Sequence, residues 1–233
     1  MDIGYSFGQM IWIVLVYSFL GWCCEVAFAA VRRGIFVNRG FLNGPYCPIY
    51  GCGALLDILI LGKIESPGLL FFLGALVTCS LEYLTSYLME KMFHARWWDY
   101  SHMRFHINGR VCLLGAVVFG AFSAVLIKVL HPFVVHCTSL LPPVWFHCIV
   151  AVLFAGFLAD NIVTFAGMAD FREKLALLVE EYEKLRTVGK QEVAERRRAM
   201  RERFSAQQRR MIDAFPKLRH SLDQLKALRD RKK

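Results

Sequence analysis

The chain has 233 residues, of which 56% are apolar and 20% are charged, and its mean hydropathy is +0.41. Several apolar runs approach or exceed the ~20 residues that a helix needs to cross a bilayer. This composition argues against a soluble enzyme, a secreted disulfide scaffold and a disordered protein.

The net charge of +9 is concentrated in the last part of the chain. Residues 1–167 have a net charge of +1, whereas residues 168–233 have a net charge of +8. We therefore expect a polytopic transmembrane domain over residues 1–167, followed by a soluble, basic tail over residues 168–233.

Five apolar segments are expected to form transmembrane helices, which predicts an all-α integral membrane protein. The second segment is short and opens with proline and glycine. The N-terminus lacks the basic region and cleavage site of a signal peptide, so the first segment is expected to be an uncleaved span. The five segments cover residues 9–31, 46–61, 67–93, 111–135 and 143–167.

Basic residues in the connecting segments indicate the orientation, because lysine and arginine accumulate on the cytoplasmic side. The second connection offers only Lys63, beside Glu65, and the fourth has no lysine or arginine. The N-terminus is therefore expected outside and the tail in the cytoplasm. The basic residues of the first and third connections are Arg32, Arg33, Arg39, Lys91, Arg96, Arg104 and Arg110.

The sequence lacks the patterns of common cofactor and catalytic sites. The eight cysteines form no CxxC pair and most lie in apolar runs, so we interpret them as small buried side chains. The motifs GxxxxGK[ST], HExxH and GxSxG are also missing. We expect no metal, no other cofactor and no ATP hydrolysis through a phosphate-binding loop, which favours a protein that is not an enzyme.

The tail is predicted to be helical and coiled-coil-like, because apolar residues recur at heptad spacing from Leu175 to Leu185 and from Met211 to Leu225. Pro216 is expected to break or begin a helix. A basic run between the stripes is either a solvated helical face or a contact with anionic lipid headgroups. Nucleic-acid binding is not expected, because no aromatic platform accompanies the run. The lipid-headgroup candidates are Arg196, Arg197, Arg198 and Arg201.

Three carboxylates are expected in the inner half of the membrane, where charges are costly and tend to line pathways. They are Glu25, Glu82 and Asp160, on three different spans; Asp57 lies deeper. Tyr17, Gly21 and Glu25 share one helical face, as do Glu82, Ser86 and Glu90. Gly21 would let another helix approach closely. These faces could converge on a polar cleft that opens to the cytoplasm.

The first and third connections supply the opposite charge. The first is rich in glycine, proline, asparagine and tyrosine, so its backbone can turn sharply and re-enter the membrane. Arginines of both connections could pair with the three carboxylates or hold a phosphate. Two interpretations stay open: pairs that only lock the helices together, and a ligand or ion pathway. The pathway candidates are Glu25, Glu82, Asp160, Asn161, Arg39, Asn43, Tyr46, Tyr50, Arg96, Trp97, Asp99, Asn108 and Arg110.

The same residues resemble a known family. The pattern runs from Tyr17 to Trp22 with Glu25, continues through residues 38–51 and Glu82, and ends with residues 96–101 and 108–113. Over roughly residues 10–165 the chain is similar to the ABC-transporter type IV (CmpB-like) family of bacterial membrane proteins. This resemblance implies a multi-pass protein of the bacterial cytoplasmic membrane with a permease-like role. It assigns neither a substrate nor catalytic residues.

The sequence therefore predicts a permease-like component that moves a small polar solute or ion through an inner-leaflet polar cleft. One copy has few spans for a complete pathway, so a homodimer or a partner is expected, and a separate ATPase subunit is possible within such a family. Two alternatives remain: a membrane-embedded enzyme that acts on lipid headgroups, and a scaffold that recruits a partner through its tail.

Overall fold

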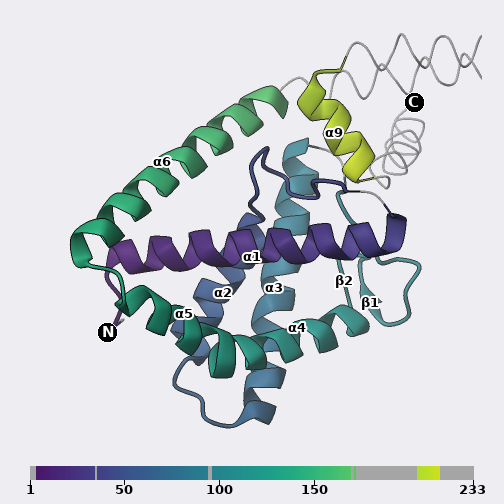
Figure 1. Cartoon of the computed structure of the whole chain (residues 1–233). Coiled ribbons are helices and arrows are strands. Elements are labelled where there is room, and N and C mark those ends of the chain that lie inside the picture. Colours follow the sequence, from purple (N-terminus) through teal and green to yellow (C-terminus); the bar gives the residue numbers. More distant parts are fainter. Residues whose placement is uncertain (1–3, 35, 94–95, 169–170, 172–203, 216–233) are drawn as a thin grey trace, which may run out of the picture.

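The computed structural model describes residues 4–34, 36–93, 96–168, 171 and 204–215. Helices dominate this part of the chain (Figure 1). In chain order the elements are α1 (Phe7–Arg33), α2 (Pro48–Leu61), α3 (Pro67–Phe93), β1 (His106–Ile107), β2 (Val111–Cys112), α4 (Leu113–Val125), the π-helical turn η1 (Leu126–Leu130), α5 (His131–Ser139), α6 (Pro143–Met168) and α9 (Ala206–Ala214).

Four helical segments are long and apolar enough to cross a membrane. They are most of α1, the whole of α3, the continuous run from Leu113 to Ser139, and α6. Each has 26 or 27 residues, which is about 40 Å of helix. The predicted all-α membrane fold is confirmed at this level. The 14-residue α2 is about 21 Å long, short of the ~30 Å hydrocarbon core, so its crossing stays a prediction.

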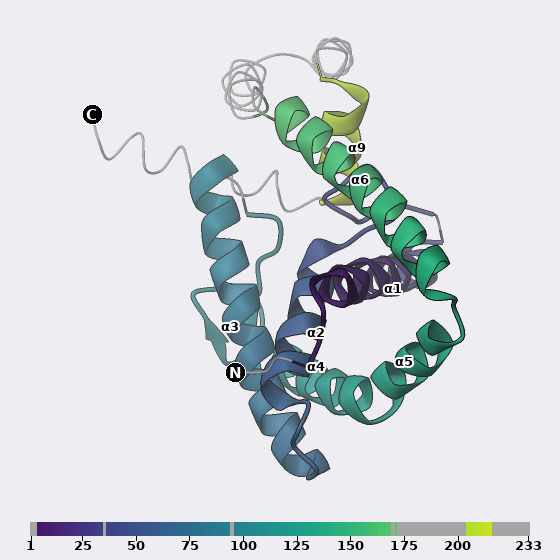
Figure 2. The ribbon, with the colours of Figure 1, turned by 90° about the vertical axis from the view of Figure 1, so that its left-hand side faces the viewer.

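Helix α2 packs against both α1 and α3, whereas α4 packs on α3 and α6 packs on α1. Figure 1 shows α1 running across the view and α3 running down it, and Figure 2 shows α2 between them with α1 nearly end-on. The close approach of α1 and α2 depends on glycine. A Cβ atom at Gly51 would collide with Ser18 and with the backbone of Val14. Many of the remaining apolar side chains are exposed, as expected of surfaces that face lipid.

The fourth long segment contains a π-helical turn. The N–H group of His131 bonds to the carbonyl of Leu126, five residues earlier. Pro132 follows directly; its ring lacks an N–H group and would clash with a carbonyl in an ordinary helix. The wider turn accommodates the proline, so the helix continues to Ser139, past the predicted end at residue 135.

A short hairpin precedes α4, because β1 and β2 pair antiparallel. Its turn contains Asn108 and Gly109, both with positive φ (51° and 69°). The hairpin takes residues 111 and 112, with which the predicted fourth span began, and the helix starts at Leu113.

The described part of the tail docks on the membrane helices. Helix α9 begins with a capping box of Ser205 and Gln208 and ends at Ala214, two residues before Pro216. Met211 is buried in an apolar cluster with Phe93, Trp97 and Met168 of the transmembrane part, and thus packs on the membrane helices. Most residues of the predicted stripes lie outside the described residues, as do Arg196, Arg197, Arg198 and Arg201.

Candidate functional site

The connection between α1 and α2, residues 36–47, returns to the middle of α1. Its last residue, Cys47, donates its backbone N–H to the carbonyl of Ser18 (2.9 Å). Asn38 is held by Trp22, whose indole N–H donates to the Asn38 side-chain oxygen (2.8 Å). The connection, here called the re-entrant loop, therefore lies along the C-terminal half of α1.

Asp160 of α6 fixes the backbone of the re-entrant loop. Its two carboxylate oxygens accept the N–H groups of Asn43 (3.1 Å) and Gly44 (2.7 Å). The Asn43 amide donates to the Thr164 hydroxyl one turn further along α6 (3.1 Å). Asp160 is thus engaged with backbone amides of the loop and does not join Glu25 and Glu82.

Arg210 of α9 fixes the same loop from its carbonyl side. Its guanidinium donates to the carbonyls of Asn38 (3.4 Å), Gly40 (2.9 Å) and Phe41 (3.2 Å). Burial lowers the pKa of Arg210, and the nearby Asp160 carboxylate opposes this effect. Sequence analysis missed this residue, because one arginine among many in a basic tail carries no distinguishing signal.

Glu25 of α1 contacts both α2 and the re-entrant loop. It pairs with Arg39 (3.2 Å) and accepts a hydrogen bond from the Tyr50 hydroxyl (2.8 Å). The Tyr50 ring lies directly against Gly21, so the expected close approach at Gly21 is observed. The predicted pairing of a loop arginine with Glu25 is confirmed for Arg39.

Glu82 of α3 is only 7% exposed and carries no ion pair among the described residues. The Tyr100 hydroxyl donates to its Oε1 atom (3.1 Å), whereas its Oε2 atom has no hydrogen-bond partner in the described part of the chain. Burial raises the pKa of Tyr100, and the carboxylates of Glu82 and then Glu25 raise it further, so this phenol stays a proton donor.

Glu25 and Glu82 thus influence the same hydroxyl, although they come from different helices. We call the group of Glu25, Arg39, Tyr50, Glu82 and Tyr100 the carboxylate cluster. It contains two carboxylates and one cationic side chain. Among the described residues, the Oε2 atom of Glu82 has no hydrogen-bond donor beside it.

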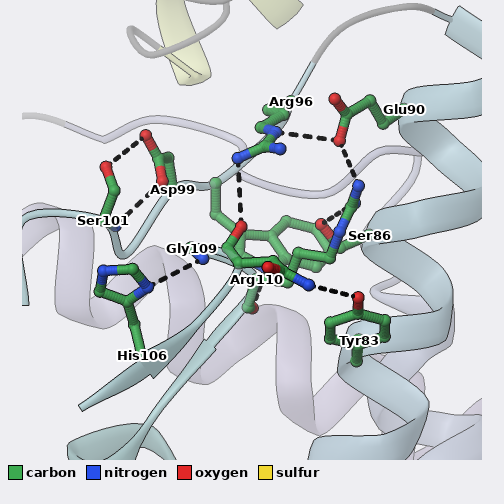
Figure 3. A network of polar contacts seen from close by, with 11 residues as sticks. Tyr83, Ser86, Glu90, Arg96, Asp99, Ser101, His106, Gly109 and Arg110 are labelled. Atoms are coloured by element: carbon green, nitrogen blue, oxygen red, sulfur yellow. Dashed lines mark hydrogen bonds and ion pairs between the residues drawn. The ribbon is translucent and has the colours of Figure 1, made fainter.

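A second polar group, the Glu90 network, lies at the end of α3 (Figure 3). Glu90 pairs with Arg96 (2.9 Å) and Arg110 (2.6 Å), and Arg110 also donates to the Ser86 hydroxyl (3.3 Å). The Arg110 guanidinium lies beside the Tyr83 and Tyr87 rings, 5.6 and 5.5 Å from their centroids. 

The hairpin completes this network. Arg96 donates to the Asn108 carbonyl (3.2 Å), and the Asn108 amide donates to the Tyr83 hydroxyl (2.9 Å). Asp99 accepts from the backbone and hydroxyl of Ser101 (3.0 and 2.9 Å). The expectation that Arg96 and Arg110 pair with Glu25, Glu82 or Asp160 is wrong for the pairs that the structure describes. Both arginines lie beside Glu90, which shares a helical face with Glu82 but was not among the pathway candidates.

Three other candidates lie away from the carboxylate cluster. The Asn161 amide donates to the Phe157 carbonyl of its own helix (2.7 Å). Tyr46 packs edge-on against the Phe157 ring, with centroids 5.5 Å apart. Trp97 is buried in the apolar cluster beneath α9. Among the residues that the structure describes, no group of three histidine, cysteine, aspartate or glutamate side chains could hold a metal ion.

Comparison with known proteins identifies the family over most of the membrane part. A family model described as "Putative ABC-transporter type IV" matches residues 12–165. No curated protein and no solved structure matches the chain. The matched range contains every member of the carboxylate cluster and of the Glu90 network. The chain belongs to the ABC-transporter type IV (CmpB) family of membrane transport-related proteins.

Proposed function

We propose that the chain is a permease-like component that moves a small cation, or a polar solute with a cationic group, across the cell membrane. Family membership and the long apolar helices support a transport-related membrane protein. The single observation that carries the proposal is Glu82, a buried carboxylate that is not paired with a cation among the described residues.

The charge balance of the carboxylate cluster favours a cation over an anion. Glu25 and Glu82 carry two negative charges, and Arg39 supplies one positive charge. A buried charge that lacks a partner is costly, so a cation or a proton at the open Oε2 atom of Glu82 would offset that cost. Tyr100 would hold the carboxylate in position, and Tyr50 would do the same for Glu25.

The arrangement of the re-entrant loop supports a second crossing that is only partly helical. Non-helical backbone is tolerated within a membrane where protein covers it. Asp160 and Arg210 bind the amides and carbonyls of the loop, which provides such cover. The loop and α2 together would complete five crossings, with the N-terminus outside and the tail in the cytoplasm. Residues 1–167 would then form the membrane domain.

The partners of the complete transporter form the rest of the proposal. One copy offers few helices for a closed pathway, so we propose that it works as a homodimer or with another membrane subunit. Family membership allows a separate ATPase subunit. The basic run of the tail would contact anionic lipid headgroups of the inner leaflet.

The test is to purify the protein from its native membrane in mild detergent and to identify retained small molecules and subunits by mass spectrometry. The wild type should retain a cationic small molecule or ion that Glu82→Gln loses at least tenfold. Glu65→Gln is the matched control, because Glu65 is exposed in the connection between α2 and α3. A stoichiometric ATPase would support the transporter assembly.

Retention of the same ligand by Glu82→Gln, or no ligand in any variant, would contradict the proposal. An altered membrane lipid profile in a strain carrying Glu25→Gln would point instead to an enzyme that acts on lipid headgroups.

A further inference from the structure

A buried carboxylate outside the carboxylate cluster lies in the apolar interior of the membrane part. Asp57 of α2 is 1% exposed. Its neighbours on α2, Ala54, Ile58 and Leu61, belong to the apolar cluster that joins α2 to α1, α3 and η1. An ionised carboxylate is costly in such surroundings unless a cation or several hydrogen-bond donors compensate it. The contacts of Asp57 therefore indicate whether it is ionised.

The polar contacts of Asp57 are few. Its Oδ2 atom lies 2.5 Å from the Ser123 hydroxyl of α4, and its Oδ1 atom has no hydrogen-bond partner among the described residues. No ion pair joins Asp57 to a lysine or arginine in the described part of the chain. A single hydroxyl is little compensation for a carboxylate charge in an apolar interior.

The Ser123 hydroxyl has two oxygen neighbours and only one proton to donate. Besides Asp57, it lies 3.0 Å from the carbonyl of Phe119, one turn earlier in α4. Serine within a helix commonly donates to the carbonyl four residues earlier. If Ser123 does so, the proton in its contact with Asp57 comes from the carboxyl group. Protonated Asp57 then donates to Ser123, Ser123 donates to Phe119, and each contact contains one proton.

An ionised Asp57 satisfies the same contacts less well. Ser123 would have to donate to Asp57, and its lone pairs would then face the Phe119 carbonyl oxygen. The Oδ1 atom would be a charged acceptor without a donor. In the protonated acid, Oδ1 is a neutral carbonyl oxygen, and the missing hydrogen bond costs less than it does for a charged group.

Close packing of α3 on α4 holds Ser123 in place. A Cβ atom at Gly74 of α3 would collide with the Ser123 side chain, and a Cβ atom at Gly120 of α4 would collide with the carbonyl of Phe71. A proton needs no space of its own in such an interface. Divalent metal ions bound by oxygen take about six ligands, more than the recorded contacts of Asp57 supply.

The titratable groups on the neighbouring elements have other partners. Lys128 of η1 donates to the carbonyl of Ile64 (3.0 Å). His131, at the start of α5, contacts two tyrosine hydroxyls (2.8 and 3.2 Å). Glu82 of α3 accepts from a tyrosine of the carboxylate cluster. None of these recorded contacts, which cover the described residues, supplies Asp57 with a positive charge.

We infer that Asp57 and Ser123 form a proton-binding site that joins α2 to α4. The bound proton lies on Oδ2 of Asp57 and is donated to Oγ of Ser123, while the Ser123 proton is donated to the Phe119 carbonyl. Release of the bound proton to water would leave a carboxylate charge in the apolar interior and would weaken the link between the two helices. The inference does not depend on the proposed cation site at Glu82.

The experiment is infrared spectroscopy of the purified full chain, produced with aspartate that carries carbon-13 in its side-chain carboxyl group. The difference between the labelled and unlabelled proteins reports aspartate alone, so Glu82 does not contribute. Aspartate in water has a pKa of about 3.9 and is ionised at neutral pH. The wild type should nevertheless show the carbonyl band of a protonated aspartic acid at neutral pH.

Asp57→Asn should reduce this band at least fivefold. The matched control is Asp99→Asn, because Asp99 also bonds to a serine hydroxyl (2.9 Å) but is partly exposed and lies outside the apolar interior. This control should keep the band.

Ser123→Ala provides a second variant, in case Asp57→Asn does not fold. It should keep the band and move it to higher frequency, because the acid loses its hydrogen-bond acceptor. Absence of the band from the wild type at neutral pH would overturn the inference. A band that a folded Asp57→Asn retains, or that Ser123→Ala leaves at the same frequency, would also overturn it. Ligand retention is tested separately through Glu82→Gln, so the failure of one proposal is distinguishable from the failure of the other.

Discussion

Glu82 and Glu90 lie on the same face of α3, about two turns apart, yet their surroundings differ sharply. Glu90 is paired with two arginines, whereas Glu82 is more deeply buried and bonds to a phenol. Every charged side chain in the ion pairs of the Glu90 network has an opposite charge beside it, whereas Glu82 in the carboxylate cluster has none among the described residues. Charge pairing therefore distinguishes a group whose ion pairs join α3 to the hairpin from a buried carboxylate that has no cationic partner among the described residues.

The Glu90 network joins the end of α3 to the hairpin before α4. Arg110 touches Glu90, Ser86 and the two tyrosine rings, so its position is fixed from several sides. Removal of one partner from such a group leaves a buried charge uncompensated, which costs more than the pair itself contributes.

The largest effect is expected for Glu90→Gln. This variant leaves Arg96 and Arg110 without their carboxylate and should lower the free energy of unfolding by about 3 kcal/mol. The measurement is the thermal midpoint in detergent, with Glu65→Gln as an exposed control. A midpoint equal to that of the wild type would show that the network does not hold the hairpin in place.

A smaller loss of stability is expected for Arg210→Gln. This variant tests the carboxylate cluster indirectly, because Arg210 binds the re-entrant loop that carries Arg39. The variant loses the charged donors to three loop carbonyls, at a cost of about 2 kcal/mol. Cys47, 8% exposed at the end of the loop, should then react several-fold faster with a maleimide.

Arg209→Gln is the matched control, because Arg209 is the neighbouring arginine on α9 and makes no recorded contact with the loop in the described residues. Equal labelling of Cys47 in both variants would show that α9 does not restrain the loop.

The sequence predicted the helices of this fold far better than its polar contacts. Hydropathy alone placed the segment 67–93 as α3 and located α6 within one residue, because long apolar runs determine where membrane helices form. Spacing also predicted the close approach at Gly21. These features depend on local sequence.

The partners of the charged residues depend on contacts between distant segments. The sequence could not show that Arg96 and Arg110 meet Glu90, because this depends on the positive-φ turn that precedes Arg110 and supplies the Asn108 carbonyl to Arg96. Arg210 reaches the re-entrant loop from about 170 residues further along the chain. The π-helical turn before Pro132 likewise has no signal in hydropathy.

Tyr100→Phe tests how much the hydrogen bond to Glu82 contributes to stability, in comparison with the ion pairs of Glu90. The variant removes the recorded hydrogen bond to Glu82 and leaves the buried carboxylate without it, at a cost of about 1 kcal/mol. The thermal midpoint should fall less than in Glu90→Gln. Tyr83→Phe, which removes a hydroxyl from the other network, gives the matched comparison. A larger fall of the thermal midpoint in Tyr100→Phe than in Glu90→Gln would show that the carboxylate cluster, and not the Glu90 network, is the group that stabilises the fold.

The smallest effect on stability is expected for Glu82→Gln, although the same variant should abolish ligand retention. Glutamine keeps the acceptor for Tyr100 and removes a charge that no recorded ion pair compensates among the described residues, so the free energy of unfolding should change by less than about 0.5 kcal/mol or rise. Because Glu82 and Glu90 share one helix and one face, their glutamine variants differ mainly in what surrounds the carboxylate. A loss of stability in Glu82→Gln as large as in Glu90→Gln would mean that Glu82 is held by a compensating charge, and that it is a structural residue with no capacity left for a cation.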